Sequence, residues 1–100
     1  MGKLITVVWR DIPSHIIFKT KSGKFKKQMS PRFEKAIDRA AMRAGKGSSD
    51  AYMADWRREI VKIKTDDPQS IVDQEIELLE QMFSDDLLEK TVKSKGIKEE

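Results

Sequence analysis

Residues 3–10 read KLITVVWR, and this short stretch decides the fold class. Its centre, Ile5–Trp9, is β-branched and aromatic with no helical period, which is typical of an interior β-strand. Asp11-Ile12-Pro13 ends the strand, because proline fixes φ and holds the residue before it in an extended or turn conformation. Such a strand needs further elements to cover it, and the rest of the sequence supplies them.

Three more strands are predicted downstream. Residues 15–21 (HIIFKTK) form the second, and Ser22-Gly23 is a hairpin turn signal. Residues 24–29 (KFKKQM) alternate like an edge strand, whose lysines guard it against mispairing. Residues 59–65 (EIVKIKT) predict a fourth strand.

Helix signals separate and follow these strands. Ser30-Pro31 predicts a helix start with a hydroxyl N-cap, and Gly45 and Gly47 predict its end. An apolar stripe runs along this helix through Phe33, Ile37, Ala40, Ala41 and Ala44. Ser48-Ser49-Asp50 predicts a short second helix that reaches about Arg58.

Asp67-Pro68 repeats the start signal and opens a third helix. Its stripe consists of Val72, Ile76, Leu79 and Phe83. Ser84 predicts the cap of a short continuation through Val92. These elements predict an α+β two-layer domain, with a mainly antiparallel sheet of three or four strands packed by two longer helices plus short helices. We expect one domain over residues 1–93 and a flexible charged tail over 94–100, with a shared core of Ile5, Val7, Phe33, Ile37, Ile76, Leu79 and Phe83.

Composition limits the classes of function. The 100 residues contain no cysteine, which excludes disulfides, thiolate nucleophiles and cysteine metal sites and fits a reducing cytosol. No apolar run approaches the ~18 residues of a membrane span. Met1–Trp9 lacks a cleavage site, so we expect a cytoplasmic protein without a signal peptide. The net charge of +3 conceals a basic half, residues 1–58 at +9, and an acidic half, residues 59–100 at −6.

Catalytic and metal-binding residues are scarce. His15 is the only histidine, and no serine or carboxylate stands at a recognisable spacing from it. Aspartates at the predicted helix starts are explained by capping. Gly45-Lys46-Gly47-Ser48 follows a helix rather than a strand, so it does not match a phosphate-binding loop. We therefore expect no enzyme, cofactor or metal.

Basic residues raise a nucleic-acid alternative. The hairpin and the first helix could follow a phosphate backbone through Lys24, Lys26, Lys27, Lys35, Arg39 and Arg43. An ordinary solvated face explains the same charges, because small domains normally carry charged surfaces.

Three blocks of the sequence resemble a known family. WRDIP (9–13), a helix block from Ser30 to Gly45 and DAYMADWRR (50–58) are similar to the small bacterial "virulence factor" domain family. The resemblance implies no reaction and no catalytic residues. Related domains occur beside iron–sulfur-scaffold-like domains and near folate- and corrinoid-dependent methyl-transfer genes. This context implies an accessory of a cofactor or methyl-transfer assembly.

The tryptophans Trp9 and Trp56 are each followed by arginine. Such groups are typical of interface hot spots, and they are equally typical of a core tryptophan with an arginine paired to a nearby carboxylate. If these groups belong to an interface, we expect one patch for a protein partner, formed by Arg10, Asp11, Tyr52, Arg57 and Arg58. In the structural reading, Arg10 pairs with Asp55 or Asp11. The sequence therefore predicts a protein-interaction or accessory module, with nucleic-acid binding as the alternative.

Overall fold

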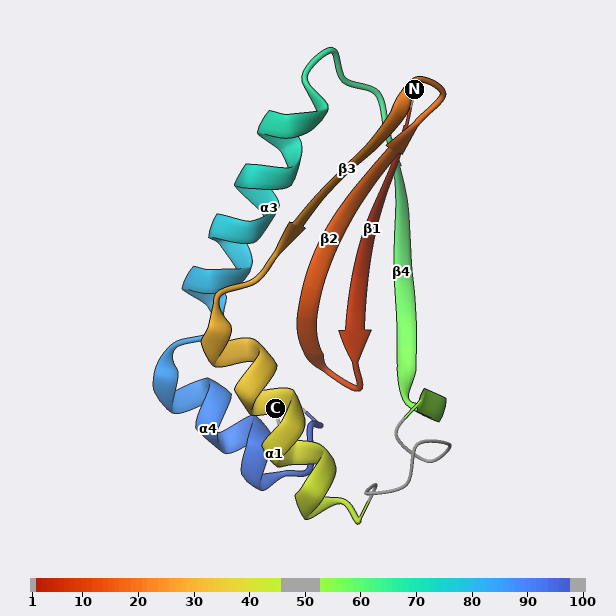
Figure 1. Ribbon diagram of the computed structural model, residues 1–100. Coiled ribbons are helices and arrows are strands. Elements are labelled where there is room, and N and C mark those ends of the chain that lie inside the picture. Colours follow the sequence, from red (N-terminus) through yellow and green to blue (C-terminus); the bar gives the residue numbers. More distant parts are fainter. Residues whose placement is uncertain (1, 46–52, 98–100) are drawn as a thin grey trace.

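Strand β1 (Gly2–Trp9) lies inside a four-stranded antiparallel sheet of order β3-β2-β1-β4 (Figure 1). The computed structural model describes residues 2–45 and 53–97. Over these residues, β2 (Ile12–Thr20) and β3 (Gly23–Gln28) form the predicted hairpin, and β4 (Trp56–Ile63) pairs with the other side of β1. Helices α1 (Pro31–Arg43), α3 (Pro68–Met82) and α4 (Asp85–Lys93) complete the α+β fold that the sequence predicts.

Different helices pack against different parts of the sheet. Helix α3 packs against β2 and β3, while α1 packs against β2 and against α4. Figure 1 shows α3 along one side of the sheet and the α1–α4 pair below its end. Phe33 of α1 meets Phe83, after α3, edge to face with ring centroids 5.7 Å apart, so the two groups of helices share one core.

The predicted core holds for four of its five residues from the helical segments, whereas its two β1 residues are buried but lie outside the shared cluster. Leu4 of β1 joins Ile16 and Phe18 of β2 in the main core, whereas Ile5 and Val7, although only 7% exposed, face the opposite side of the sheet. The residues of β1 are apolar on both faces, so alternation could not show which set meets the helices. Leu79, also placed in the predicted core, is half-buried at its margin.

The predicted second helix does not extend to Arg58. Residues 53 and 54 form a helical turn, and β4 begins at Trp56, three residues before the predicted strand. Trp56, Arg57 and Arg58 pair with Trp9, Val8 and Val7 along β1, and this backbone pairing replaces the helix. The start signal at residues 48–50 lies outside the described residues.

Two of the three predicted helix caps form as expected. Asp67 accepts a hydrogen bond from the Ser70 amide at 3.2 Å, and Ser84 accepts one from the Leu87 amide at 3.1 Å. Ser30 precedes α1, but its hydroxyl makes no cap bond and donates to Glu80 of α3 instead. The helix start is therefore confirmed, and the expected hydroxyl cap is wrong.

The segment after α4 contacts the β1–β2 turn. The Asp11 amide donates to the Gly96 carbonyl at 2.8 Å, and the Arg10 guanidinium donates to the Lys95 carbonyl at 2.8 Å. Gly96 has φ +89°, and a Cβ there would come within 2.7 Å of the fully buried Trp9 ring. Among the described helices, none is long and apolar enough to cross a membrane.

Candidate interaction surface

One face of the sheet carries no helix over most of its length, and α1 reaches only the end near His15. The side chains of this face form three rows across the strands. The register places Lys24, Lys19, Lys3 and Lys62 in the first row. The second row holds Lys26, Ile17, Ile5 and Ile60, and the third holds Gln28, His15, Val7 and Arg58. We call these twelve residues the open face. Figure 1 is viewed from this side.

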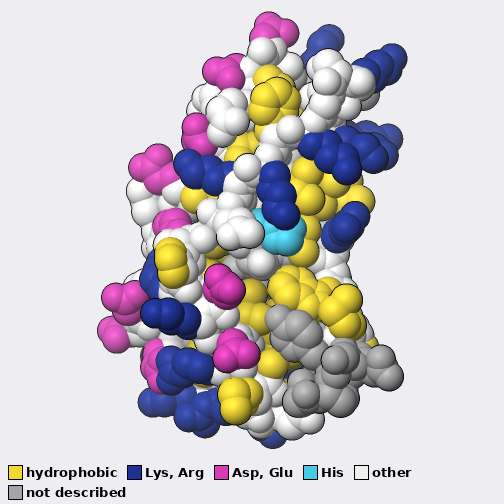
Figure 2. Space-filling view, in the orientation of Figure 1, with side chains coloured by type: hydrophobic (Ala, Val, Ile, Leu, Met, Phe, Trp, Pro, Cys, Tyr) yellow, Lys and Arg dark blue, Asp and Glu magenta, His cyan; other side chains and the backbone are white. Residues whose placement is uncertain are grey.

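The open face is strongly basic. No strand contributes a carboxylate to it. The exposed cations on this face are Lys3, Lys19, Lys24, Lys26, Arg58 and Lys62. None of the six makes an ion pair with another residue in the described parts of the chain. Figure 2 shows dark blue and yellow side chains over the sheet, and both magenta and dark blue ones over the helices. The surface therefore joins positive charge to apolar area.

Three cations outside the open face pair with carboxylates of the acidic helices α3 and α4. Lys27, which faces α3, pairs with Asp73 at 3.0 Å. Arg39 of α1 makes a two-pronged pair with Glu89 of α4, with both bonds at 2.9 Å. The acidic half of the sequence thus folds against the helix side and leaves the charge of the open face uncompensated.

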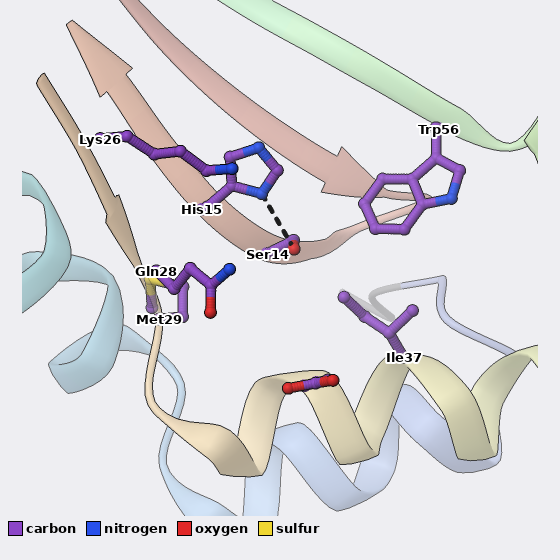
Figure 3. Close-up of a pocket in the computed structure, with 8 residues that line it drawn as sticks. Ser14, His15, Lys26, Gln28, Met29, Ile37 and Trp56 are labelled. Atoms are coloured by element: carbon purple, nitrogen blue, oxygen red, sulfur yellow. Dashed lines mark hydrogen bonds between the residues drawn. The ribbon is translucent and has the colours of Figure 1, made fainter. Parts of the chain in front are cut away.

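His15 lies within the third row, at the upper border of a hollow of about 290 Å³ between the sheet and α1 (Figure 3). Its Nδ1 lies 3.2 Å from the Ser14 hydroxyl. Burial, with the positive charges of Lys26 and Arg58, lowers the pKa of His15 below its ordinary value. At neutral pH the imidazole is therefore neutral, and Ser14 and Glu34 line the same hollow.

The structure brings three residues of the predicted partner patch together, because Arg10, Asp11 and Arg57 line one hollow. Arg57 pairs with Asp11 at 3.2 Å on the helix side of β4, whereas Arg58 points to the open face. Arg10 pairs with Asp55 at 3.3 Å and stacks on Trp9 at 5.1 Å, which matches the structural alternative for that residue. Tyr52 lies outside the described residues. That these side chains bind a partner stays a prediction.

The nucleic-acid candidates are also divided. Lys24 and Lys26 lie on the open face, while Lys27 and Arg39 are held in the ion pairs described above. Lys35 lines a separate hollow between α1 and α4, and Arg43 is exposed on the last turn of α1. The hairpin and the first helix therefore do not form one cationic surface.

Sequence reasoning missed two of the open-face cations and the isoleucine row. Lys3 and Lys62 were not candidates, nor was Ile60. The available signal was the period of two: Arg58, Ile60 and Lys62 alternate in β4, as Lys24 and Lys26 do in β3. That signal becomes useful only when the register of all four strands is known.

The chain belongs to the family described as Virulence factor, whose model matches residues 7–92. The match extends beyond the three blocks that suggested it and includes β4, α3 and most of α4. Neither curated proteins nor solved structures gave a match.

Proposed function

We propose that the protein is an interaction module whose open face binds an acidic and apolar segment of a partner protein. The observation that carries the proposal is the combination, on one largely uncovered sheet face, of a central isoleucine row and six cations that pair with no carboxylate among the described residues. Ile60 is 56% exposed at one end of that row, so apolar area is available to a partner. Charged and apolar groups in this arrangement select a partner with carboxylates around an apolar centre.

The central row favours protein over single-stranded nucleic acid. Sheets that bind bases place aromatic side chains at their centre, because every base has a face that stacks on a ring. Here the corresponding positions are Ile17, Ile5 and Ile60, whose aliphatic side chains offer no stacking platform. Trp56 lies on the same side of β4 as Ile60, but it is half-buried beside Ile37 at the hollow near α1, outside this row.

Nucleic acid remains the second candidate because of the first row. Four lysines in line across four strands could contact phosphates without reading bases. Binding of that kind would be independent of sequence and would weaken steeply with salt, because each neutralised phosphate releases counterions.

Binding to defined probes distinguishes the two candidates. We would titrate the protein with acidic-apolar peptides and with oligo-dT while following backbone amide NMR shifts. We expect peptide-induced shifts in the strands around Ile17, Ile60 and Arg58, and weaker binding of oligo-dT at physiological salt. Shifts confined to the helices, or tighter binding of oligo-dT, would contradict the proposal.

A pair of matched variants tests the surface itself. Arg58→Glu reverses an open-face charge on β4, and Lys35→Glu reverses a charge on α1, away from that face. Only Arg58→Glu should weaken the peptide, by about fivefold, the effect of a favourable charge contact of about 1 kcal/mol. Equal losses in both variants would indicate attraction by net charge alone.

We further propose that the partner belongs to a cofactor or methyl-transfer assembly, which this protein serves as an accessory. An accessory of a cofactor or methyl-transfer assembly would bind through an acidic segment on that assembly. Co-purification of the tagged protein with such an assembly, lost in Arg58→Glu and kept in Lys35→Glu, would support this role. Co-purification that Arg58→Glu leaves unchanged would contradict it.

A further inference from the structure

Strand β4 is an edge strand of the sheet that the described residues form. It pairs with β1 over eight consecutive residue pairs, from Gly2↔Ile63 to Trp9↔Trp56, without a bulge. No described strand pairs with its other side, and residues 57–62 are all exposed. The strand contains neither proline nor glycine, so its outer backbone groups form a regular template for another strand.

The opposite edge of the sheet is protected. Strand β3 is two residues shorter than β4 and carries lysines at positions 24, 26 and 27. Helix α3 packs against β3, and Asp73 of α3 holds Lys27 in an ion pair. A segment that extends the sheet would therefore add beside β4.

The side chains of β4 specify what that segment carries. On the open-face side, Arg58, Ile60 and Lys62 follow one another, with a cation on each side of an apolar residue. On the other side, Val61 is 56% exposed, as Ile60 is. Directly opposed residues interact across neighbouring strands, and opposite charges or apolar pairs are favourable there. The complementary sequence is acid-x-apolar-x-acid.

We propose that an extended segment with the pattern acid-x-apolar-x-acid adds to the sheet beside β4. This inference rests on the proposed function and specifies its geometry. Main-chain hydrogen bonds to the free edge hold the segment, and its alternate side chains read Arg58, Ile60 and Lys62. The pattern reads the same in both directions, so it is compatible with a parallel or an antiparallel fifth strand.

A second copy of the chain is a poorer occupant of this edge. Pairing β4 with β4 of another copy would join two open faces into one surface, each with six cations. The repulsion between these charges opposes such a pair, because Glu59 is the only carboxylate that β4 supplies. An acidic segment instead neutralises the face as it binds.

Selective N-methylation of a synthetic peptide tests strand addition. A methyl group removes an amide donor, and in a paired strand only alternate amides point to the neighbouring strand. We would compare an acid-x-apolar-x-acid peptide with two derivatives, methylated at even or at odd positions. One derivative should lose about tenfold or more in affinity, and the other should stay within about threefold of the parent.

The outcomes separate this inference from the function on which it rests. If both derivatives bind like the parent, the open face recognises side chains alone, and strand addition is wrong while the interaction module stands. If acidic-apolar peptides do not bind in any form, both proposals fail. A loss of affinity in only one of the two methylated derivatives supports both proposals.

Variants of β4 provide an independent check. Lys62→Glu should weaken the parent peptide about fivefold, because it places like charges opposite each other. The matched control is Lys64→Glu, an exposed change just beyond the end of β4. Equal affinity in both variants, with thermal melts like that of the parent protein, would overturn the assignment to this edge.

Discussion

The pKa of His15 depends on its burial and on the charged side chains around it. Lys26 of β3 and Arg58 of β4 raise the cost of protonating the ring, and burial acts in the same direction. Glu34 of α1 lines the same hollow, and Ser14 contacts Nδ1. The net result is a pKa below the ordinary value of about 6.5.

This depressed pKa gives the fold a pH-dependent stability. The unfolded chain takes up a proton at His15 as pH falls through about 6.5, and the folded protein does not until a lower pH, so the free energy of unfolding decreases between the two values. His15→Gln should flatten that part of the curve. Urea titrations at several pH values between 5 and 8 measure it. An equally steep fall in the variant would show that another group is responsible.

Phe33 anchors α1 in the shared core. It is fully buried and meets Phe83 edge to face. Phe33→Ala should lower the free energy of unfolding by about 3–5 kcal/mol, because it removes a large apolar side chain and leaves a cavity. Met42→Ala is the control on the same helix, since Met42 is 73% exposed. Thermal melts of the two variants that agree within a degree or two would contradict this packing.

At the scale of elements, α1 and α3 are joined by one carboxylate. Glu80 of α3 accepts hydrogen bonds from the Ser30 amide at 2.8 Å, from the Ser30 hydroxyl at 2.9 Å and from Arg32 at 3.1 Å. The start of α1 is therefore capped by a residue fifty positions away. Such a cap holds the two helices in a fixed relation.

Replacing this carboxylate should loosen the pair of helices. Burial alone would raise the pKa of Glu80, but the hydrogen bonds from Ser30 and Arg32 outweigh it, and the pKa is lowered. The stabilisation is thus present above the ordinary value and is lost as pH falls through the folded value. Glu80→Gln should cost about 1–2 kcal/mol at neutral pH and less in acid. Glu77→Gln is the control, and equal urea midpoints for the two would contradict the cap.

Among the secondary-structure elements, the helices could be predicted from the sequence more fully than the pairing of the strands. Proline and cap signals identified α1, α3 and α4, because those signals are local. Strand pairing is not local. The β1–β2 register shifts between Val7 and Val8, where Ser14 is the extra residue, and nothing in residues 1–20 indicates it. The open face depends on that register and on β4, so the sequence revealed its lysines only in part.

At the scale of the whole molecule, folding separates charge rather than cancelling it. The acidic helices α3 and α4 take up cations from the helix side, as in Lys27–Asp73 and Arg39–Glu89. The cations of the open face receive no such partner from the described residues. Pairing on one side thus concentrates positive potential on the other, where it can guide an anionic partner.

The chain segment after α4 gives the last prediction, because it decides where the domain ends. The sequence predicts a flexible tail from residue 94, whereas the structure places Gly96 against Trp9, with hydrogen bonds from Asp11 and Arg10. Truncation after Lys93 removes these contacts and exposes Trp9, whose ring is now fully buried. We expect it to lower the free energy of unfolding by about 1–3 kcal/mol, the value of one large apolar side chain returned to water. Truncation after Ile97 keeps every one of these contacts and serves as the control. Tryptophan emission should shift to longer wavelength only in the shorter protein, and the urea midpoint should fall only there. Identical midpoints for the two truncated proteins would place the end of the domain at residue 93, as the sequence predicts.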